Sequence, residues 1–238
     1  MKIALIGYGK MGKEIERCAI EKKFAVSAVF DENNPVTVQS IADAEVCIDF
    51  SVPSAVVNNI KVYAKAGKNA VIGTTGWLEH LDEVTRIVRD SGTGLIYTSN
   101  FSIGVNMFYK IIAHAAELMN SFSDYDAYVH ELHHNQKVDS PSGTALSIAK
   151  IMIEKLDRKK SLLSDTSKGK ISADQLHITS TRIGSVPGTH TVGFDSPADS
   201  IELTHTARNR SGFALGALFA ARWIQGKGGV YTMKDALK

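Results

Sequence analysis

The chain has 238 residues, of which 44% are hydrophobic and 22% charged, and its formal net charge is +2. This length is sufficient for one large domain or two modest domains with cores of their own. No basic cluster is interleaved with aromatic residues, and the short KGK (168–170) and RKK (158–160) runs are interpreted as solvated surface. The composition therefore does not indicate nucleic-acid binding.

The two cysteines and the first residues of the chain bear on the compartment. Cys18 and Cys47 are too few and too far apart for a disulfide framework or a cysteine zinc site, so we expect them to pack as small hydrophobes. The N-terminus runs directly into an apolar strand without a signal-peptide pattern, and no apolar run approaches the ~20 residues of a membrane span. We expect a soluble cytoplasmic protein with no membrane contact.

The first segment predicts a strand, a glycine turn and a helix. KIALI (2–6) is apolar, GYGKMG (7–12) follows, and the residues after it have helical spacing. In such a turn Gly7 permits the tight bend, Gly9 lets a pyrophosphate approach the backbone, and Gly12 permits close helix–strand packing. A second strand ends at Asp31, 19 residues after Gly12. That is where dinucleotide-binding folds place the acid that holds the adenosine ribose hydroxyls.

The residues around Asp31 bear on the choice of cofactor. Glu32 follows Asp31, so two carboxylates stand where the 2′-phosphate of NADPH would lie, and no arginine is nearby. Lys10 of the glycine loop is the one cation in reach. The sequence therefore favours NADH over NADPH.

Further strands alternate with helices up to about residue 100. Apolar runs at 45–50, 69–72 and 94–97 predict strands, and a helix is expected from Ser51 to Ala66. Strand–helix alternation is typical of a parallel, doubly wound, Rossmann-like α/β sheet, although only 14 residues separate Asp31 from Val46 and the crossover there must be short. Ligands bind at the carboxyl ends of such strands. The loops expected on the cofactor side comprise Gly73, Thr74, Thr75, Ser99, Asn100, Phe101 and Ser102.

The pattern changes after residue 101 and predicts an α+β domain with a mixed, antiparallel sheet. A long helix (102–120), a strand (124–132) and a second helix (144–156) precede a polar stretch, 158–175, which is expected to be a mobile loop. Three strand-like runs, HITSTRI, THTVGF and SIELTHTA, follow without helices between them. A final helix, 212–225, is expected to return to the first domain. The predicted domains are thus 1–101 with 212–238, which binds the dinucleotide, and 102–211, which binds the substrate.

The stretch from Glu131 to Ala145, ELHHNQKVDSPSGTA, carries the densest chemistry in the chain. Adjacent His133 and His134 offer proton transfer, because histidine changes charge near neutral pH, and Lys137 adds a cation. Ser142, Gly143 and Thr144 open a helix, whose first N–H groups suit a carboxylate or phosphate. Each feature alone is also common on ordinary surfaces and helix starts. Their adjacency indicates an active site.

The same stretch contains a literal H-E-x-x-H pattern from His130 to His134, with Glu154 downstream as a third candidate ligand. That zinc-binding pattern requires a helix, on which the two histidines share one face. The preceding residues are rich in Tyr and Val and favour a strand, on which His133 points away from His130 and His134. We therefore expect no metal.

These motifs together resemble the dihydrodipicolinate reductase family. ELHHNQKVDSPSGTA, GYGKMG, GTTGW, SNFSIGVN and SIELTHTARNRSGFALGALFAARWI occur in the family's order through almost the whole chain. The resemblance implies NAD(P)H-dependent reduction of 4-hydroxy-tetrahydrodipicolinate, a small dicarboxylate, in the diaminopimelate route to lysine. It also implies a cytoplasmic homotetramer assembled through the sheets of the substrate domain, which makes 102–211 a tetramerisation domain as well.

The resemblance assigns roles to individual positions. His133 is expected to be the general acid/base and Lys137 a proton donor, and His134, Lys137, Gly143 and Thr144 are expected to hold the substrate. Glu32 departs from members that favour NADPH, which tend to have arginine after the ribose-binding acid. The positions expected to bind the dinucleotide are Gly7, Tyr8, Gly9, Lys10, Met11, Gly12, Asp31, Gly73, Thr74, Thr75, Ser99, Asn100, Phe101 and Ser102.

The chemistry of such a substrate agrees with the residues. A cyclic imine with two carboxylates needs cations and helix-start N–H groups, and after loss of its hydroxyl as water the ring accepts hydride at C4 and then a proton. We expect the two domains to close on a hinge near Ser102 and Arg210, because hydride transfer needs close approach. Three alternatives remain: another two-domain imine or amino-acid dehydrogenase, a non-catalytic NAD(H)-binding sensor, and a zinc hydrolase.

Overall fold

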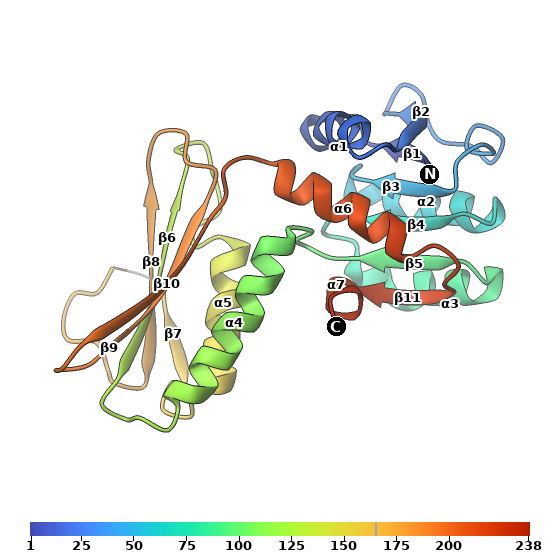
Figure 1. Ribbon diagram of the computed structural model, residues 1–238. Coiled ribbons are helices and arrows are strands. Elements are labelled where there is room, and N and C mark those ends of the chain that lie inside the picture. Colours follow the sequence, from blue (N-terminus) through green and yellow to red (C-terminus); the bar gives the residue numbers. More distant parts are fainter. Residues whose placement is uncertain (165) are drawn as a thin grey trace. The chain divides into compact units, whose positions relative to one another are not determined.

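The computed structural model describes residues 1–164 and 166–238. The chain divides into two compact units, Met1–Ile103 with Arg210–Lys238, and Gly104–Asn209. Figure 1 shows both units along the chain.

The first unit is built on a six-stranded sheet in which every pairing is parallel. The strand order is β11-β5-β4-β3-β1-β2, which confirms the expected Rossmann-like, doubly wound sheet. Its strands are β1 (Lys2–Ile6), β2 (Ala25–Phe30), β3 (Val46–Asp49), β4 (Asn69–Ile72), β5 (Gly94–Tyr97) and β11 (Gly229–Thr232). Its helices are α1 (Lys10–Glu21), α2 (Pro53–Lys65), η1 (Leu78–His80), α3 (Leu81–Ser91), α6 (Ser211–Trp223) and α7 (Met233–Ala236).

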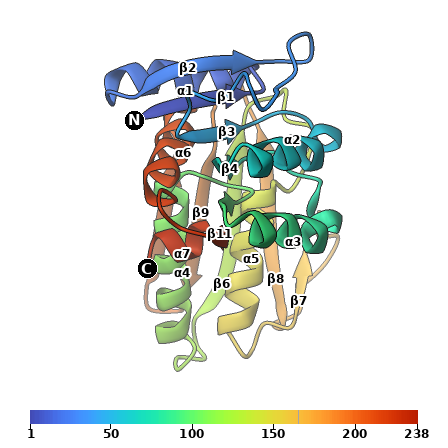
Figure 2. The ribbon, with the colours of Figure 1, turned by 90° about the vertical axis from the view of Figure 1, so that its right-hand side faces the viewer.

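Helices cover both faces of this sheet (Figure 2). Successive residues of a strand point to opposite faces of the sheet, and in β1 both sets are apolar. Ile3 and Leu5 pack with α1 and α6, while Ala4 and Ile6 pack with α2 and α3. Both cysteines are buried in these layers, as expected. The short crossover between β2 and β3 contains no helix and covers the sheet with turns.

The C-terminal segment adds a strand that the sequence pattern did not indicate. β11 pairs with β5 at the edge of the sheet. The side chain of Asn69 fixes this return, because its Nδ2 donates to the carbonyl of Ile224 (2.6 Å) and its Oδ1 accepts from the N–H of Gly94 (2.7 Å). One amide thus connects the end of α6 to β4 and β5.

The second unit has one five-stranded mixed sheet with helices on one face. Its order is β10-β9-β6-β8-β7, with β8 parallel to β6 and β7, and β9 antiparallel to β6 and β10. The apolar residues of both helices pack on the sheet in a single cluster. The elements are α4 (Ile103–Met119), β6 (Asp126–His133), α5 (Gly143–Lys155), β7 (Ser161–Leu163), β8 (Gln175–Arg182), β9 (Thr189–Asp195) and β10 (Ser200–Thr206).

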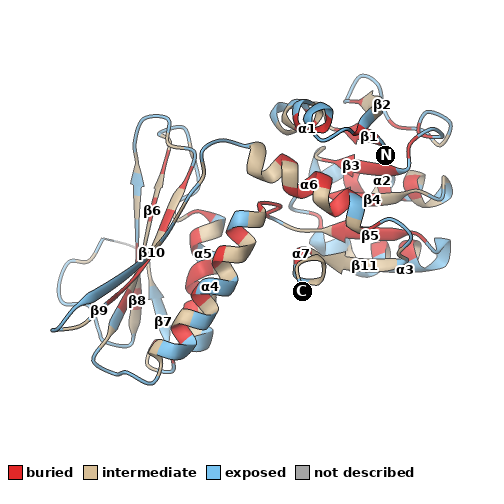
Figure 3. Cartoon of the chain, viewed as in Figure 1, coloured by how far each residue is buried: buried red, intermediate tan, exposed pale blue. Residues whose placement is uncertain are grey.

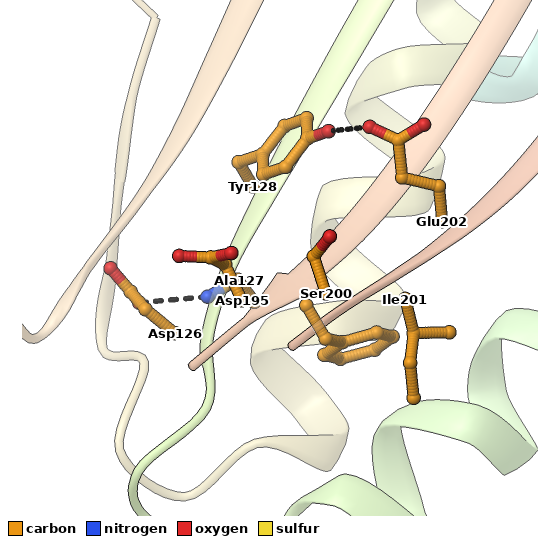
Figure 4. Close-up of a pocket in the computed structure, with 8 residues that line it drawn as sticks. Asp126, Ala127, Tyr128, Asp195, Ser200, Ile201 and Glu202 are labelled. Atoms are coloured by element: carbon orange, nitrogen blue, oxygen red, sulfur yellow. Dashed lines mark hydrogen bonds between the residues drawn. The ribbon is translucent and has the colours of Figure 1, made fainter. Parts of the chain in front are cut away.

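Among the described residues the other face of this sheet carries no helix, and most of its side chains are polar. Burial alternates along β6, whose residues Figure 3 colours by exposure. Gly193 of β9 lies between Tyr128 and Glu202, and its missing side chain leaves room for the Tyr128 ring. The Tyr128 hydroxyl crosses it to donate to Glu202 (2.5 Å), as Figure 4 shows. A shallow pocket of about 360 Å³ opens at this end of the sheet, between residues of β6, β9 and β10.

Two expectations for the stretch 158–175 were wrong. Part of the expected mobile loop is β7, which pairs with β8 at the sheet edge. Lys159, in a run expected to be solvated, is only 1% exposed because its ammonium donates to two backbone carbonyls (2.7 and 2.9 Å) and pairs with Asp126 at 2.5 Å. Residues 164 and 166–174 contain no helix or strand, and residue 165 of the expected loop lies outside the described residues.

Across the part of the chain that the structure describes, helices long and apolar enough to cross a bilayer are absent.

We predict that Gly216→Ala destabilises the first unit. Gly216 is buried on α6, and a Cβ there would collide with the carbonyl oxygen of Phe101. Overpacking of this kind costs about 1–3 kcal/mol, which exceeds the ~1 kcal/mol that alanine gains over glycine in a helix. Urea unfolding followed by circular dichroism measures the change. Gly212→Ala, on the same helix, is the control, because its Cβ would make only a 3.4 Å contact with Ser102 Oγ. Equal stabilities of the two variants would contradict the prediction.

Candidate active site

The glycine turn at the start of α1 has the backbone that the sequence indicated. Gly7 has φ +86°, and a side chain there would collide with the backbone at Phe50. A Cβ at Gly12 would collide with the carbonyl of Gly7, whereas a Cβ at Gly9 would meet no atom within 4 Å. Gly7 and Gly12 thus serve packing, while Gly9 leaves the helix start open. Gly9 is the N-cap of α1, and no acidic side chain lies in the first helical turn, so this position suits an anionic phosphate.

Asp31 lies at the carboxyl end of β2 and is exposed, as are Glu32 and Lys10. Its Oδ1 accepts hydrogen bonds from the N–H groups of Asn33 (2.9 Å) and Asn34 (3.0 Å). The carboxylate is therefore held in place by its own turn before any ligand binds.

The loop after β4 is organised by a buried acid that the sequence analysis did not single out. Asp49, fully buried at the end of β3, accepts hydrogen bonds from the Ser51 N–H (2.9 Å), Asn59 Nδ2 (3.0 Å), the Tyr63 hydroxyl (2.7 Å) and Thr74 Oγ1 (3.4 Å). Burial, followed by the Asp49 charge, raises the pKa of Tyr63, so the phenol stays protonated and donates. This network fixes the Gly73–Thr75 loop at the carboxyl edge of the sheet.

The other positions expected near the cofactor differ in exposure. Thr75 and Ser99 are exposed, and Asn100 Oδ1 accepts from the N–H of Ser102 (3.0 Å) inside the loop after β5. The side chain of Phe101 is only 2% exposed and belongs to the core, 5.9 Å from the Phe50 ring. Tyr8 bonds Glu16, and Met11 packs against the core. Phe101 therefore offers a ligand its backbone rather than its ring.

In the second unit, β6 separates the residues of the H-E-x-x-H pattern. Glu131 and His133 are buried beneath the helices, whereas His130 faces the open side with Nδ1 2.6 Å from Thr179 Oγ1. The strand assignment is confirmed, so the two-histidine geometry of a helical zinc site does not form.

Glu131 is the centre of a buried polar cluster. Its Oε2 lies 2.5 Å from Nδ1 of His133, and its Oε1 accepts from the Ser142 N–H (3.0 Å) and the Arg182 guanidinium (2.9 Å). Burial favours the neutral acid, but the contacts with His133, Arg182 and Ser142 outweigh it and hold the pKa of Glu131 well below its usual range. A fully buried carboxylate is therefore ionised between the His133 ring and the Arg182 guanidinium.

His190 of β9 completes this cluster. Its ring meets that of His133 edge to face at 5.2 Å, and its Nε2 lies 3.2 Å from Ser142 Oγ. Burial and the neighbouring His133 lower the pKa of His190 to about 4. The ligand-type atoms of Glu131, His133 and His190 lie within 4.8 Å of one another. However, Glu131 and His133 are in direct contact, whereas ligand atoms sharing a zinc ion with bonds of about 2 Å lie roughly 3 Å apart. The cluster is thus built on a direct carboxylate–imidazole contact.

The loop between β6 and α5 carries Lys137, whose ammonium lies 2.7 Å from the Asp139 carboxylate. Arg182 also donates to the carbonyl of Asp139 (2.7 Å), which joins this loop to the Glu131 cluster. The Lys137 ammonium and nearby backbone N–H groups, including that of Gly143, lower the pKa of Asp139. A carboxylate is thus stabilised between the lysine and the start of α5.

The start of α5 has the expected cap. Ser142 Oγ accepts from the N–H of Ala145 (3.2 Å), and Gly143 is exposed with no atom within 4 Å of an added Cβ. Thr144 and His134 are half-buried. All substrate-binding positions predicted from the sequence therefore lie in this strand, loop and helix start, while Glu131, Arg182 and His190 are the partners that sequence reasoning did not identify as functional.

The open glycine turn on a parallel sheet and the buried acid–imidazole pair beside a lysine define a two-domain, dinucleotide-dependent oxidoreductase. Family models described as the N-terminus and the C-terminus of dihydrodipicolinate reductase match residues 1–101 and 104–237. The chain belongs to the dihydrodipicolinate reductase family.

Individual relatives agree with this assignment. The 4-hydroxy-tetrahydrodipicolinate reductase of Christiangramia forsetii is 42% identical, with 100% of this chain and 98% of that protein covered. The enzyme of the same name from Archaeoglobus fulgidus is 37% identical, with both chains covered completely. A dipicolinate-bound dihydrodipicolinate reductase from Paenisporosarcina sp. TG-14 has the same fold, with a TM-score of 0.80 at 23% identity and coverage of 99% and 98%.

We predict that His190 makes the stability of the protein depend on pH. Its folded-state pKa of about 4 lies below the ordinary 6.5, so the unfolded chain binds the proton first as the pH falls. The stabilising effect of a neutral His190 is complete above pH 6.5 and is lost progressively toward pH 4. Its loss amounts to about 2 kcal/mol at roughly pH 5.

Urea unfolding of the wild type and His190→Gln at about pH 7.5 and about pH 5 measures this contribution. The variant should lose less stability than the wild type between the two pH values. His114→Gln, which replaces an exposed histidine of α4, is the control. An unchanged pH dependence in His190→Gln would contradict the prediction.

Proposed function

We propose that this protein reduces 4-hydroxy-2,3,4,5-tetrahydrodipicolinate with NAD(P)H, as the names of its relatives indicate, in the diaminopimelate route to lysine. The observation that carries the proposal is the buried Glu131–His133 pair, which lies next to the Lys137 loop and the start of α5. One chain segment thus provides a proton donor and a binding site for carboxylates. The alternative dehydrogenase and the sensor have no feature in their favour over this assignment.

The first unit fits a nicotinamide dinucleotide, which supplies the hydride when it is bound. The N–H groups at the start of α1 and the open space at Gly9 suit the pyrophosphate, and Asp31 suits the ribose hydroxyls. Glu32 beside Asp31 disfavours a 2′-phosphate, while exposed Lys10 is the nearby cation, so we propose that NADH is favoured and NADPH accepted. The loops at Gly73–Thr75 and Ser99–Ser102 complete the proposed cofactor site.

The second unit fits a small dicarboxylate. Asp139 already pairs with Lys137 near the Gly143 N–H, which supports these groups as the binding site of one substrate carboxylate. His134, Ser142 and Thr144 surround the same helix start. The solved relative named as dipicolinate-bound carries an aromatic dicarboxylate of similar shape.

Reduction also requires a proton, and His133 is placed to give it. Once the ring hydroxyl has left as water and C4 has received the hydride, the electron-rich ring takes a proton from the imidazolium of His133. Lys137 stabilises the developing charge and contributes a second N–H donor. The two units meet in sequence at 103–104 and 209–210, next to Ser102 and Arg210, where we propose the hinge on which they close.

The first test is the initial rate of NADH and NADPH oxidation with freshly generated 4-hydroxy-tetrahydrodipicolinate. Lys137→Ala and His133→Ala should each lower turnover by about 10²-fold or more, because general acid catalysis contributes 10²–10⁴-fold. Binding of NADH, measured by fluorescence, should remain within about twofold of the wild type, since that unit is unchanged.

The ratio of the two cofactor rates tests the Asp31–Glu32 argument. Dinucleotide binding without oxidation of either cofactor would contradict the assigned substrate and favour the sensor. A loss of NADH affinity in His133→Ala would contradict the assignment of His133 to the substrate site rather than the cofactor site.

We also propose that the protein is a cytoplasmic homotetramer that assembles through the open sheet face of the second unit. Threonines of neighbouring strands form a row there, with Thr191 and Thr204 hydroxyls 3.0 Å apart. Thr191→Arg should lower the molar mass of the assembly measured by light scattering, because an unpaired charge at the centre of an interface costs on the order of 2–5 kcal/mol. Glu154→Arg, exposed on α5, is the control. A wild-type monomer, or an unchanged tetramer in Thr191→Arg, would contradict the proposal.

A further inference from the structure

We propose that Glu131 is a positioning residue for the reduction: it holds the Nδ1–H of His133 and thereby directs Nε2 to deliver the proton. This inference deepens the proposed function and rests on it. Glu131 lies two positions before His133, the expected acid, and on the same face of β6.

The carboxylate of Glu131 has little freedom to move. Oε1 is fixed by the Ser142 N–H (3.0 Å) and by Arg182 (2.9 Å), which come from α5 and β8. The remaining oxygen, Oε2, lies 2.5 Å from Nδ1 of His133. Because the side chain is 0% exposed, water does not compete for these contacts. The carboxylate that contacts the imidazole is therefore held by groups from α5 and β8.

The proton balance follows from this contact. The imidazolium carries protons on both ring nitrogens, and Nε2 gives its proton to the carbanionic carbon of the reduced ring, forming one C–H bond and breaking one N–H bond. The neutral imidazole that remains is the Nδ1–H tautomer, which is the form that Glu131 stabilises. Glu131 keeps its negative charge throughout, since its partners lower its pKa and it does not take the proton.

Nε2, the other ring nitrogen of His133, lies against Gly188. A Cβ at Gly188, in the segment before β9, would lie 2.8 Å from Nε2 of His133. Glycine at this position therefore avoids a side-chain collision with Nε2. The acid therefore has one nitrogen held by a carboxylate and the other beside a residue without a side chain.

Glu131 also relates the acid to the substrate site. The N–H that it accepts belongs to Ser142, the N-cap of α5, whose first turn is proposed to bind a carboxylate. Arg182 balances its charge and holds the carbonyl of Asp139, beside Lys137. Arg182 therefore supports both Glu131 and the loop that carries Lys137.

Steady-state kinetics of Glu131→Gln test this role beside an exposed control, Glu117→Gln of α4. Glu131→Gln keeps the shape but can donate or accept, so it no longer imposes a tautomer, and kcat should fall by about 10²-fold with a small change in KM. Glu117→Gln, whose exposed carboxylate pairs with Lys155, should leave kcat and KM within about twofold of the wild type. A kcat of Glu131→Gln close to the wild type, or an equal kcat loss in both variants, would overturn the proposal.

A second measurement does not depend on the substrate. In the wild-type protein labelled with 15N-histidine, the ring nitrogens of neutral His133, assigned by the signals lost in His133→Gln, should show the Nδ1–H tautomer. The Nε2–H tautomer, which predominates in free histidine, would overturn the proposal. The Nδ1–H tautomer in a protein that does not turn over 4-hydroxy-tetrahydrodipicolinate would leave the position of Glu131 correct and the proposed substrate wrong.

Discussion

The second unit is organised around one buried negative charge. Removing a carboxylate from water is costly unless cations and donors replace its hydration, and Glu131 is fully buried. Its partners come from β6, β8 and the start of α5, so those elements have to meet in one register for the charge to be satisfied. A one-residue shift of β6 would turn Glu131 to the open face and leave Arg182 without its partner. The same requirement that stabilises this arrangement therefore also assembles the site.

The two units present polar groups in different ways. In the first, glycines leave backbone N–H groups and the start of α1 open, as the proposed phosphate site requires, and side chains such as Asp49 only brace the loops. In the second, the buried Glu131 contacts His133 and Arg182, and Lys137 pairs with Asp139 in the adjoining loop, so the proposed chemistry has a proton donor and a cation as well as N–H donors. A dinucleotide brings its own reactive hydride, whereas the substrate depends on the protein for its proton.

Sequence reasoning succeeded where the cooperating residues are close together in the chain and failed where they are far apart in it. The glycine turn and the Glu131–Ala145 stretch are each continuous, so local spacing predicted their elements and their groups. Arg182 and His190 reach Glu131 from strands about 50 residues further on, and only the strand register brings them together. Lys159 was expected in water because nothing in its neighbours predicts the carbonyls of residues 173 and 175 that surround its ammonium. Long-range pairing, rather than local preference, decided these cases.

The H-E-x-x-H pattern shows how the backbone determines what a set of side chains can do. On a helix, both histidines would face one metal ion, and the acid beside them would act on a bound water. On β6 the alternation turns His130 to the threonine-lined face and brings Glu131 together with His133, outside the pair that the motif names. The acid then contacts an imidazole directly and favours one tautomer of it. The same five letters, HELHH, thus place an imidazole against a buried carboxylate because the local chain is extended, and this contact is what supports the proposed proton donor.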